Sequence, residues 1–192
     1  GAPISTPNTL YYNSSMSKNI LFVCNGNIHR SVIAAASLKK ILKERKIDSN
    51  FFVASCGLQG TKGTAMPKHT RLSEYPLEWA AARPTLKKIG LDMSKHSFQK
   101  ISAAAVKRAD VILAMDDKVY SRAKNSLIKQ FPDFKNKMHR FSELTADHKS
   151  IEDPAGSNDQ KFHKRIIERI YTTLENKYGV ILKWIGPTEK TK

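Results

Sequence analysis

The chain has 192 residues, which is enough for one domain with a substantial hydrophobic core and too few for two domains of ordinary size. Its 40% hydrophobic and 26% charged residues are typical of a soluble globular protein, and no apolar run approaches the roughly 18 residues of a membrane span. The 33 Lys and Arg against 17 Asp and Glu give a net charge of +16, which favours an anionic substrate.

The cysteine content points to a reducing compartment. Cys24 and Cys56 are the only two cysteines and are too few for a disulfide framework. No signal peptide is visible. We therefore expect a cytoplasmic protein without a membrane partner.

The ends of the chain differ from its middle. Residues 1–15 lack periodicity and precede Met16, so we interpret them as a disordered leader or a cloning remnant. Residues 186–192 are expected to be a flexible tail. A single domain is expected over residues 16–185.

Strand-like and helix-like segments alternate along that domain. The continuous apolar run 19–23 predicts a buried strand, and the segment 31–46 predicts a helix because its apolar residues recur on one stripe. Pro84 predicts a kink or a late start in the helix that contains it. The later predicted elements are, in chain order, a strand at 50–55, a helix at 76–90 ending at Gly90, a helix at 102–109, a strand at 110–115, a helix at 116–128, a short strand within 137–144 and a long helix at 158–179.

This alternation predicts an α/β fold in which a parallel sheet has helices on both faces. In such folds ligands bind beyond the carboxyl ends of the strands. Cys24 lies at that end of the first predicted strand. The cysteine is therefore a candidate site residue.

The loop from Cys24 to Ser31 has the composition of an oxyanion cradle. Gly26 and Asn27 tolerate a positive φ, which lets successive N–H groups point inward, and the following helix adds its free N–H groups and dipole. Arg30 supplies a planar fork for two oxygens of a tetrahedral anion. The same positive field favours the thiolate of Cys24, which can attack phosphorus and form a phosphocysteine.

Such a reaction needs an acid that protonates the leaving group. Asp153 in "IEDPAG" is the candidate, because the proline after it stiffens the loop and holds the aspartate extended. The same carboxylate could later deprotonate the water that cleaves the intermediate.

The chain resembles the low-molecular-weight protein tyrosine phosphatases. The resemblance covers about residues 18–180 and is carried by "VCNGNIHRS", by "EDPAG" about 130 residues later, by "VILAMDD" between them and by "GLDMSKH". It implies a four-stranded parallel sheet with helices on both faces, a Rossmann-like three-layer sandwich. It also implies a phosphatase domain that needs no metal and no cofactor.

The resemblance assigns a role to each matching residue. Cys24 would be the nucleophile, Arg30 the phosphate clamp and Asp153 the general acid and then base. Ser31 would hydrogen-bond the thiolate, and His96 would help Asn27 to hold the left-handed turn of the loop. The backbone N–H groups that would bind the phosphate oxygens are those of Asn25, Gly26, Asn27, Ile28, His29 and Arg30.

The implied substrates are phosphotyrosine-containing proteins, with inorganic phosphate or sulfate as ligand or inhibitor. Ile28 favours an aryl phosphate, since relatives that act on phosphoarginine tend to have threonine there. Ala155 and Gly156 stand where eukaryotic-type members have pocket aromatics, so Tyr75 or Trp79 is a candidate wall.

His29 replaces a second cysteine of the family that can trap an oxidised nucleophile as a disulfide. Cys56 could take over that resolving role only if it lies near Cys24. We interpret it instead as a buried residue at a strand end.

Other readings remain open at this point. The scaffold also suits an arsenate reductase or a phosphoarginine phosphatase, and the charge also suits a non-catalytic module that binds phosphate or nucleic acid. Nucleic acid is disfavoured because no aromatic-interleaved basic motif is visible. Asp116 is interpreted as a helix N-cap. The remaining histidines lack metal-ligand spacing and are interpreted as surface residues: His69, His139, His148 and His163.

Overall fold

The computed structural model describes residues 17–186, and the leader and most of the tail expected from the sequence lie outside this range. The predicted four parallel strands form one sheet, and their order is β2-β1-β3-β4. In β1, Ile20 pairs with Val53 of β2 and with Val111 of β3. The strands span Lys18–Cys24 (β1), Phe51–Gly57 (β2), Val111–Ala114 (β3) and Met138–Arg140 (β4).

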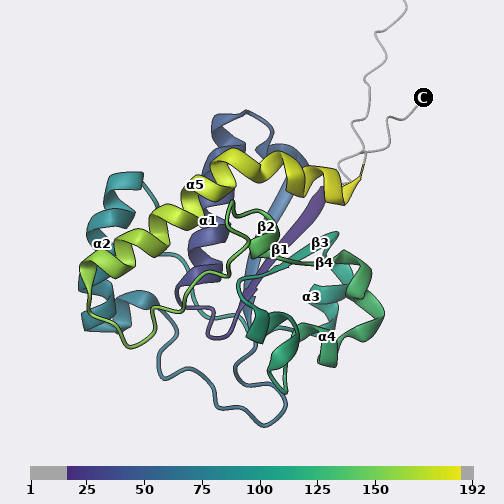
Figure 1. Ribbon diagram of the computed structural model, residues 1–192, viewed down its shortest axis with the longest axis horizontal. Helices are drawn as coiled ribbons and strands as arrows, with labels where there is room; N and C mark the ends of the chain where they lie inside the picture. Colours follow the sequence, from purple (N-terminus) through teal and green to yellow (C-terminus); the bar gives the residue numbers. More distant parts are fainter. Residues whose placement is uncertain (1–16, 187–192) are drawn as a thin grey trace, which may run out of the picture.

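Helices cover both faces of this sheet, as Figure 1 shows. The helices α1, α2 and α5 pack together on one face, and α3 and α4 lie on the other. The expected three-layer α/β architecture is therefore confirmed. The helices span Arg30–Glu44 (α1), Pro76–Ile89 (α2), Ala103–Arg108 (α3), Leu127–Gln130 (α4) and Gln160–Ile185 (α5).

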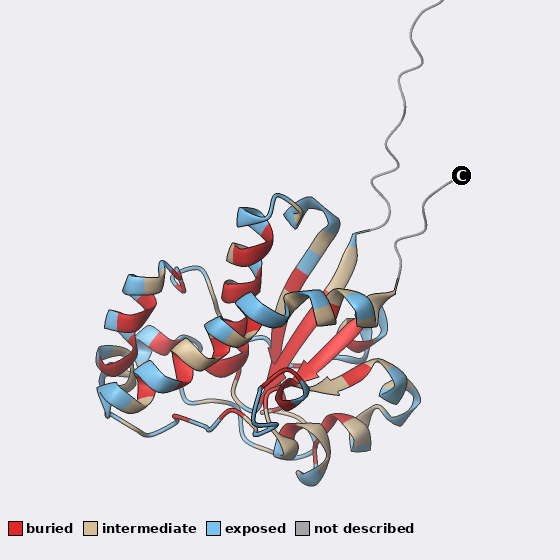
Figure 2. Ribbon diagram, turned by 45° about the horizontal axis from the view of Figure 1, so that its top comes forward, coloured by how far each residue is buried: buried red, intermediate tan, exposed pale blue. Residues whose placement is uncertain are grey.

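The central strand β1 is apolar on both sides because it feeds two hydrophobic layers, and Figure 2 shows the sheet as the buried middle of the molecule. Phe22 and Cys24 face the layer under α1 and α5. Leu21 and Val23 face the layer under α3 and α4. The alternation places the Cys24 side chain at the carboxyl end of the strand, on the α1 side.

The segment 116–128 is not the single helix that the sequence predicts. It contains a π-helical turn, Lys118–Arg122, and then the short helix α4. The Asn125 side chain between them is buried and donates to the carbonyl of Leu58 at 3.1 Å. That bond draws the chain towards the sheet and interrupts a continuous helix.

Two further helix predictions need correction. The last helix does not stop at Gly179 but continues to Ile185, because Ile181 is buried and extends the apolar stripe. The helix α2 starts at Pro76 and passes through Pro84, so the predicted late start is wrong. Its predicted end is confirmed, since Gly90 has φ 81°.

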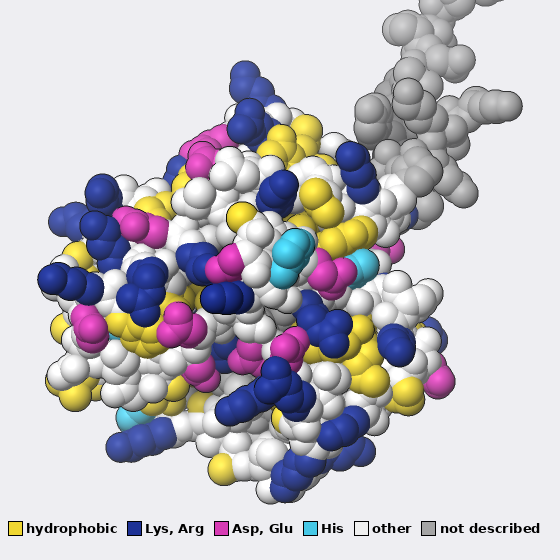
Figure 3. All heavy atoms as spheres, viewed as in Figure 1, with side chains coloured by type: hydrophobic (Ala, Val, Ile, Leu, Met, Phe, Trp, Pro, Cys, Tyr) yellow, Lys and Arg dark blue, Asp and Glu magenta, His cyan; other side chains and the backbone are white. Residues whose placement is uncertain are grey.

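On the face seen in Figure 3, the positive charge is distributed and not gathered into one patch. Figure 3 shows Lys and Arg side chains spread over the whole of one face, with fewer Asp and Glu among them. Within residues 17–186, no helix is both long enough and apolar enough to pass through a lipid bilayer.

Candidate active site

The loop that joins β1 to α1 turns on Asn27. Asn27 has φ 49°, in the left-handed region, whereas Gly26 does not have a positive φ, which corrects the expectation for that glycine. Asparagine tolerates this region because its short polar side chain can hydrogen-bond locally. A Cβ at Gly26 would approach the Gln59 side chain at 3.2 Å, so the glycine serves space and not backbone conformation.

The fully buried Asn27 is held on every polar atom of its side chain. Its Nδ2 donates to the hydroxyls of Ser31 and Ser55 at 3.0 and 2.9 Å, and its Oδ1 accepts from the N–H of Gln99 at 2.9 Å. Its backbone carbonyl lies 2.9 Å from Nε2 of His96, so His96 contacts the loop as the sequence predicts. These contacts fix the turn from behind.

Burial is the main cause that lowers the pKa of His96 below its usual value, and the nearby charges of Lys39 and Arg71 add to it. A neutral ring carries its proton on Nε2 if that atom donates to the carbonyl. His96 therefore donates to the loop across neutral and mildly acidic pH.

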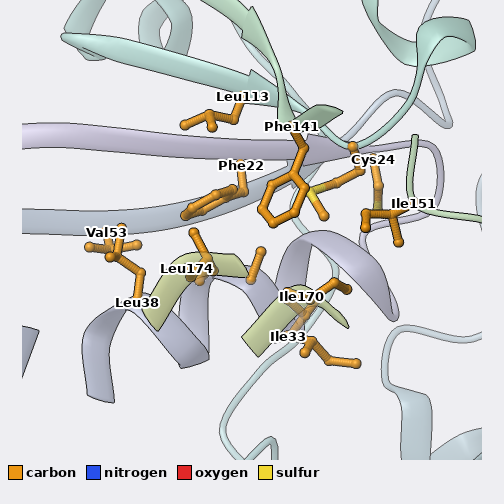
Figure 4. Close-up of a cluster of buried hydrophobic side chains, with 14 of the residues drawn as sticks. Phe22, Cys24, Ile33, Leu38, Val53, Leu113, Phe141, Ile151, Ile170 and Leu174 are labelled. Atoms are coloured by element: carbon orange, nitrogen blue, oxygen red, sulfur yellow. The ribbon is translucent and has the colours of Figure 1, made fainter. Parts of the chain in front are cut away.

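Cys24 lies at the base of the loop, as Figure 4 shows, close to Phe141 and Ile151 at the end of the core. Only 3% of Cys24 is exposed. Its Sγ lies 2.9 Å from the hydroxyl of Ser31 and accepts from the N–H of Asn27 at 3.2 Å. Both groups can stabilise negative charge on the sulfur.

The other loop N–H groups remain available to an anion. Within the described chain, those of Asn25, Gly26, Ile28 and His29 make no hydrogen bond. All four residues line a pocket above the sulfur, whereas Asn27 lies behind the loop and does not. The N–H groups of these four residues are therefore free to bind an anion in the pocket, whereas the N–H of Asn27 is already bonded to the sulfur.

Arg30, the first residue of α1, is almost completely buried and is surrounded by acceptors. Its Nη1 donates to Asp116 at 2.5 Å and to the carbonyl of Ile151 at 2.9 Å, and its Nη2 lies 3.1 Å from Asp153. Burial alone would lower the pKa of the guanidinium, but the charges of Cys24, Asp153 and Asp116 outweigh it and raise that pKa. Arg30 thus stays charged at the floor of the site.

Asp153 brings a carboxyl group to the same place from the other end of the chain. Its side chain is 49% exposed, and its Oδ1 accepts from the N–H of Ala155 at 3.1 Å. The next loop residue, Gly156, donates its N–H to Glu78 of α2 at 2.6 Å. A hydrogen bond therefore holds the Asp-Pro loop to α2, which is not part of the loop that carries Cys24.

These groups surround one pocket of about 320 Å³ that is lined by Cys24, Arg30 and Asp153. Tyr75 forms part of the wall, and its hydroxyl accepts from the N–H of His69 at 2.9 Å. Trp79 does not line this pocket but lies in a neighbouring groove, so Tyr75 is the aromatic candidate that fits. The rest of that wall comes from Met66, Pro67, Lys68 and Leu72.

The sequence interpretation missed two contacts of the site. Asp116 does accept from the N–H of Val119 at 2.8 Å, as a capping residue would, but its other oxygen binds Arg30. Its place directly after β3, at the carboxyl edge of the sheet, was the available signal. His163 is fully buried and contacts His29, so its interpretation as a surface residue is wrong.

Cys56 is separated from Cys24 by the sheet. It is buried in the layer under α3 and α4, whereas Cys24 faces the layer under α1. Burial, together with the negative charge of Cys24, raises the pKa of Cys56 to about 11. This agrees with the interpretation as a structural residue. Among residues 17–186, no three His, Cys, Asp or Glu side chains are grouped as a metal site would need.

Comparison with known proteins agrees with this geometry. The family model described as low molecular weight phosphotyrosine protein phosphatase matches residues 19–185. A low molecular weight protein-tyrosine-phosphatase of Acinetobacter johnsonii is 31% identical over 145 residues, which are 76% of this chain and 84% of that protein.

Solved structures share the fold. The low molecular weight protein tyrosine phosphatase of T. tengcongensis superposes with a TM-score of 0.67 at 26% identity, over 87% of this chain and 99% of that one. The YwlE arginine phosphatase of Geobacillus stearothermophilus has a TM-score of 0.64 at 23% identity, over 86% and 94%. A pocket that unites a loop cysteine, an arginine and a distant aspartate, together with these matches, places the chain in the low molecular weight phosphotyrosine protein phosphatase family and makes it a phosphatase.

Proposed function

We propose that the protein hydrolyses phosphotyrosine in proteins through a phosphocysteine on Cys24. The observation that carries the proposal is the meeting of Cys24, Arg30 and Asp153 at one pocket, although the third lies more than a hundred positions along the chain from the others. A thiolate, a cation and a carboxylic acid are the three groups that such a transfer needs.

In the first step the phosphate dianion lies in the loop, with its oxygens on the free N–H groups and on Arg30. The sulfur of Cys24 attacks phosphorus, and the bond from phosphorus to the phenolic oxygen breaks. Asp153 gives its proton to that oxygen, so a neutral tyrosine leaves. The 49% exposure of the carboxyl lets it meet a group that enters from solvent.

In the second step Asp153, now a carboxylate, removes a proton from water as the water attacks phosphorus. The bond from sulfur to phosphorus breaks, and inorganic phosphate leaves. The Ser31 hydroxyl, 2.9 Å from Sγ, stabilises the departing thiolate. Phosphate or sulfate would occupy the same cradle as an inhibitor, and no metal or cofactor takes part in either step.

Tyr75 supports an aryl substrate. Besides Asp153, the Asp-Pro loop offers only Pro154, Ala155 and Gly156 to the pocket and no aromatic side chain, so the opposite wall must supply the surface for a ring. We place the phosphotyrosine ring against Tyr75, which is fixed by its bonds to His69. The proposed substrates are phosphoproteins of the cytoplasm, and the proposed phosphatase domain spans residues 16–185.

A panel of phosphotyrosine, phosphoserine and phosphoarginine peptides tests the assignment, with arsenate and a thiol donor run beside it. Phosphotyrosine should be turned over fastest, and Cys24→Ser should abolish turnover while phosphate binding is retained. Faster release from phosphoarginine, or reduction of arsenate, would replace the proposal by that activity. Equal absence of turnover in wild type and Cys24→Ser would point to a binding module.

The wall is tested separately by Tyr75→Ala, with Tyr75→Phe as its control. Removing the ring should raise KM for a phosphotyrosine peptide by roughly three- to tenfold, since a stacked aromatic pair contributes about 0.5–1.5 kcal/mol. Tyr75→Phe keeps the ring and loses only the bonds to His69. Equal KM values for all three proteins would mean that the phosphotyrosine ring does not pack against Tyr75.

A further inference from the structure

Two buried histidines connect the catalytic loop to the Asp-Pro loop. Nε2 of His29 lies 3.1 Å from Nδ1 of His163, and Nε2 of His163 lies 2.8 Å from the carbonyl of Ser157. The two side chains come from the loop before α1 and from the first turn of α5, 134 positions apart. His29 is 8% exposed and His163 is fully buried, so water does not compete for these bonds.

The carbonyl at the end of this chain fixes the direction of its hydrogen bonds. A carbonyl only accepts, so Nε2 of His163 carries a proton and, in the neutral ring, Nδ1 accepts. Nε2 of His29 must then donate to it. The Nδ1 of His29 is left as a buried acceptor without a partner, and it is one of four buried side-chain nitrogen or oxygen atoms in the described part of the chain that make no hydrogen bond. An unsatisfied atom of this kind is costly, which indicates that the orientation of the ring serves another purpose.

That purpose is found in the loop that carries Asp153. The N–H of Ser157 donates to the carbonyl of Pro154 at 3.0 Å, which closes a turn directly after the aspartate. The carbonyl of the same Ser157 receives the proton of His163. Holding Ser157 therefore holds the turn, and the turn sets where the Asp153 backbone lies.

The direct contact between Arg30 and Asp153 is a weak alternative link. The carboxyl is 49% exposed, so solvent screens the pair. A phosphate dianion bound to Arg30 would also compete with the carboxylate for the same guanidinium. Neither solvent screening nor competition by phosphate acts on the hydrogen bonds of His29 and His163, because both rings are buried and these bonds do not involve Arg30.

We propose that the His29–His163 pair is a positioning device that holds the Asp153 carboxyl at the leaving-group oxygen. The inference rests on the proposed function, in which Asp153 is the acid. His29 and His163 act through Asp153 and do not touch the substrate oxygen themselves. Their loss should weaken proton donation to the leaving group and leave the attack by Cys24 almost unchanged.

The dependence of kcat/KM on the leaving group separates these two effects. Wild type, His163→Phe and His163→Gln are compared on phenyl phosphates whose phenols differ in acidity. For His163→Phe, kcat/KM should fall about tenfold or more with unsubstituted phenyl phosphate and less than about threefold with p-nitrophenyl phosphate, which needs little protonation. The amide of glutamine can donate through its nitrogen and accept through its oxygen, so His163→Gln should stay within about threefold of wild type on both.

The same loss on both substrates, or equal behaviour of His163→Phe and His163→Gln, would overturn the proposal, because a purely structural defect lowers every rate alike. Circular dichroism and phosphate binding establish that each variant is folded. If His163→Phe fails to fold, His29→Cys decides in its place: it removes the donor but keeps the residue that the family usually has there. It should show the same selective loss, and uniform rates across the series would contradict the inference.

Asp153→Ala distinguishes failure of this inference from failure of the proposed function. If Asp153→Ala itself shows no leaving-group dependence, the acid assignment fails, and the positioning role fails with it. If Asp153→Ala shows the dependence and His163→Phe does not, only the positioning role fails. In the double variant that combines Asp153→Ala with His163→Phe, the second change should increase the leaving-group effect of the first by less than about twofold. The reason is that both changes remove the same function, proton donation by Asp153.

Discussion

The site depends first on single residues whose neighbours leave them one arrangement. Asn27 has a left-handed backbone and five hydrogen-bond contacts, and Arg30 is buried among three acceptors. Such groups are pre-organised, so they need no rearrangement when an anion binds. His29 stands beside Arg30 and is the residue that most clearly departs from the family pattern.

His29 makes the nucleophile vulnerable to oxidation. A sulfenic acid on Cys24 has no neighbouring thiol, and Cys56 lies across the sheet with its pKa raised to about 11. After prolonged exposure to peroxide, dithiothreitol should restore little activity to the wild type. The variant His29→Cys should recover several-fold more, because a disulfide can form there. Full recovery of the wild type would contradict this account.

His29 should also make stability depend on pH. Burial, followed by the charges of His163 and Arg30, lowers the pKa of His29 from 6.5 to about 3. Between these values the unfolded chain binds a proton that the folded chain does not, so stability falls as the pH falls from about 6.5 towards 3.

Urea unfolding of wild type and His29→Gln from pH 7 to pH 4.5 measures this effect. The wild type should lose up to about 1.4 kcal/mol per pH unit relative to the variant below pH 6. Other acidic groups titrate in both proteins and cancel in the difference. Parallel curves would mean that His29 is charged in the folded protein or is not buried.

At the scale of elements, the end of β2 supports the catalytic loop. A Cβ at Gly57 would meet the Asn27 Cβ at 2.9 Å and the backbone of Asn25 and Asn27 at 3.0 Å. Close packing of strand against loop is thus possible only with glycine there.

Gly57→Ala should therefore weaken phosphate binding at least tenfold and cost about 1–3 kcal/mol of unfolding free energy. Gly179→Ala is the matched control, since nothing lies within 4 Å of that position in α5. The control should leave phosphate binding unchanged and stabilise the fold by up to about 1 kcal/mol. Wild-type phosphate affinity in Gly57→Ala would refute the close contact.

Local patterns predicted the elements best where one signal was strong. The apolar run of β1, the cysteine after it and Gly90 after α2 were all placed correctly. The segment 116–128 failed because a distant partner, the carbonyl of Leu58, binds Asn125 and overrides helix propensity. Local sequence contains no trace of that contact.

The three pocket groups and the supporting contacts of Asn27, Ser31 and His96 were predicted, but the contacts of Arg30 with Asp116 and of His29 with His163 were not. Cys24, Arg30 and Asp153 meet as expected, because the family motifs mark them. Asp116 was predicted as a cap and does accept from Val119, but its bond to Arg30 was not predicted, and His163 was wrongly taken as a surface residue, since only the fold brings these side chains to their partners. The left-handed turn at Asn27 was implied by the resemblance and is present, whereas the positive φ expected at Gly26 is not, because the side-chain contacts that fix the turn are made by Asn27 alone.

At the scale of the whole molecule, the property that bears on function is the net charge. The chain has a net charge of +16, and on the face in Figure 3 the Lys and Arg side chains are spread out, so we treat this charge as a general positive field. Such a field raises the rate at which acidic partners arrive, and salt screens it.

Turnover of an acidic phosphotyrosine peptide should therefore slow as salt increases. Between about 20 mM and 300 mM sodium chloride, kcat/KM should fall at least about threefold. A peptide of the same length with basic residues in place of the acidic ones is the control, and its kcat/KM should not fall. Equal salt dependence for the two peptides would show that the charge has no part in substrate capture.

The central claim is that sulfur attacks phosphorus in the loop. Enzyme mixed with p-nitrophenyl phosphate and quenched in acid within milliseconds should yield, by peptide mass spectrometry, a phosphoryl group on Cys24 and on no other residue. A phosphoryl group on another residue would contradict the account. So would the absence of any phosphoryl group under conditions where hydrolysis of the intermediate limits the steady-state rate.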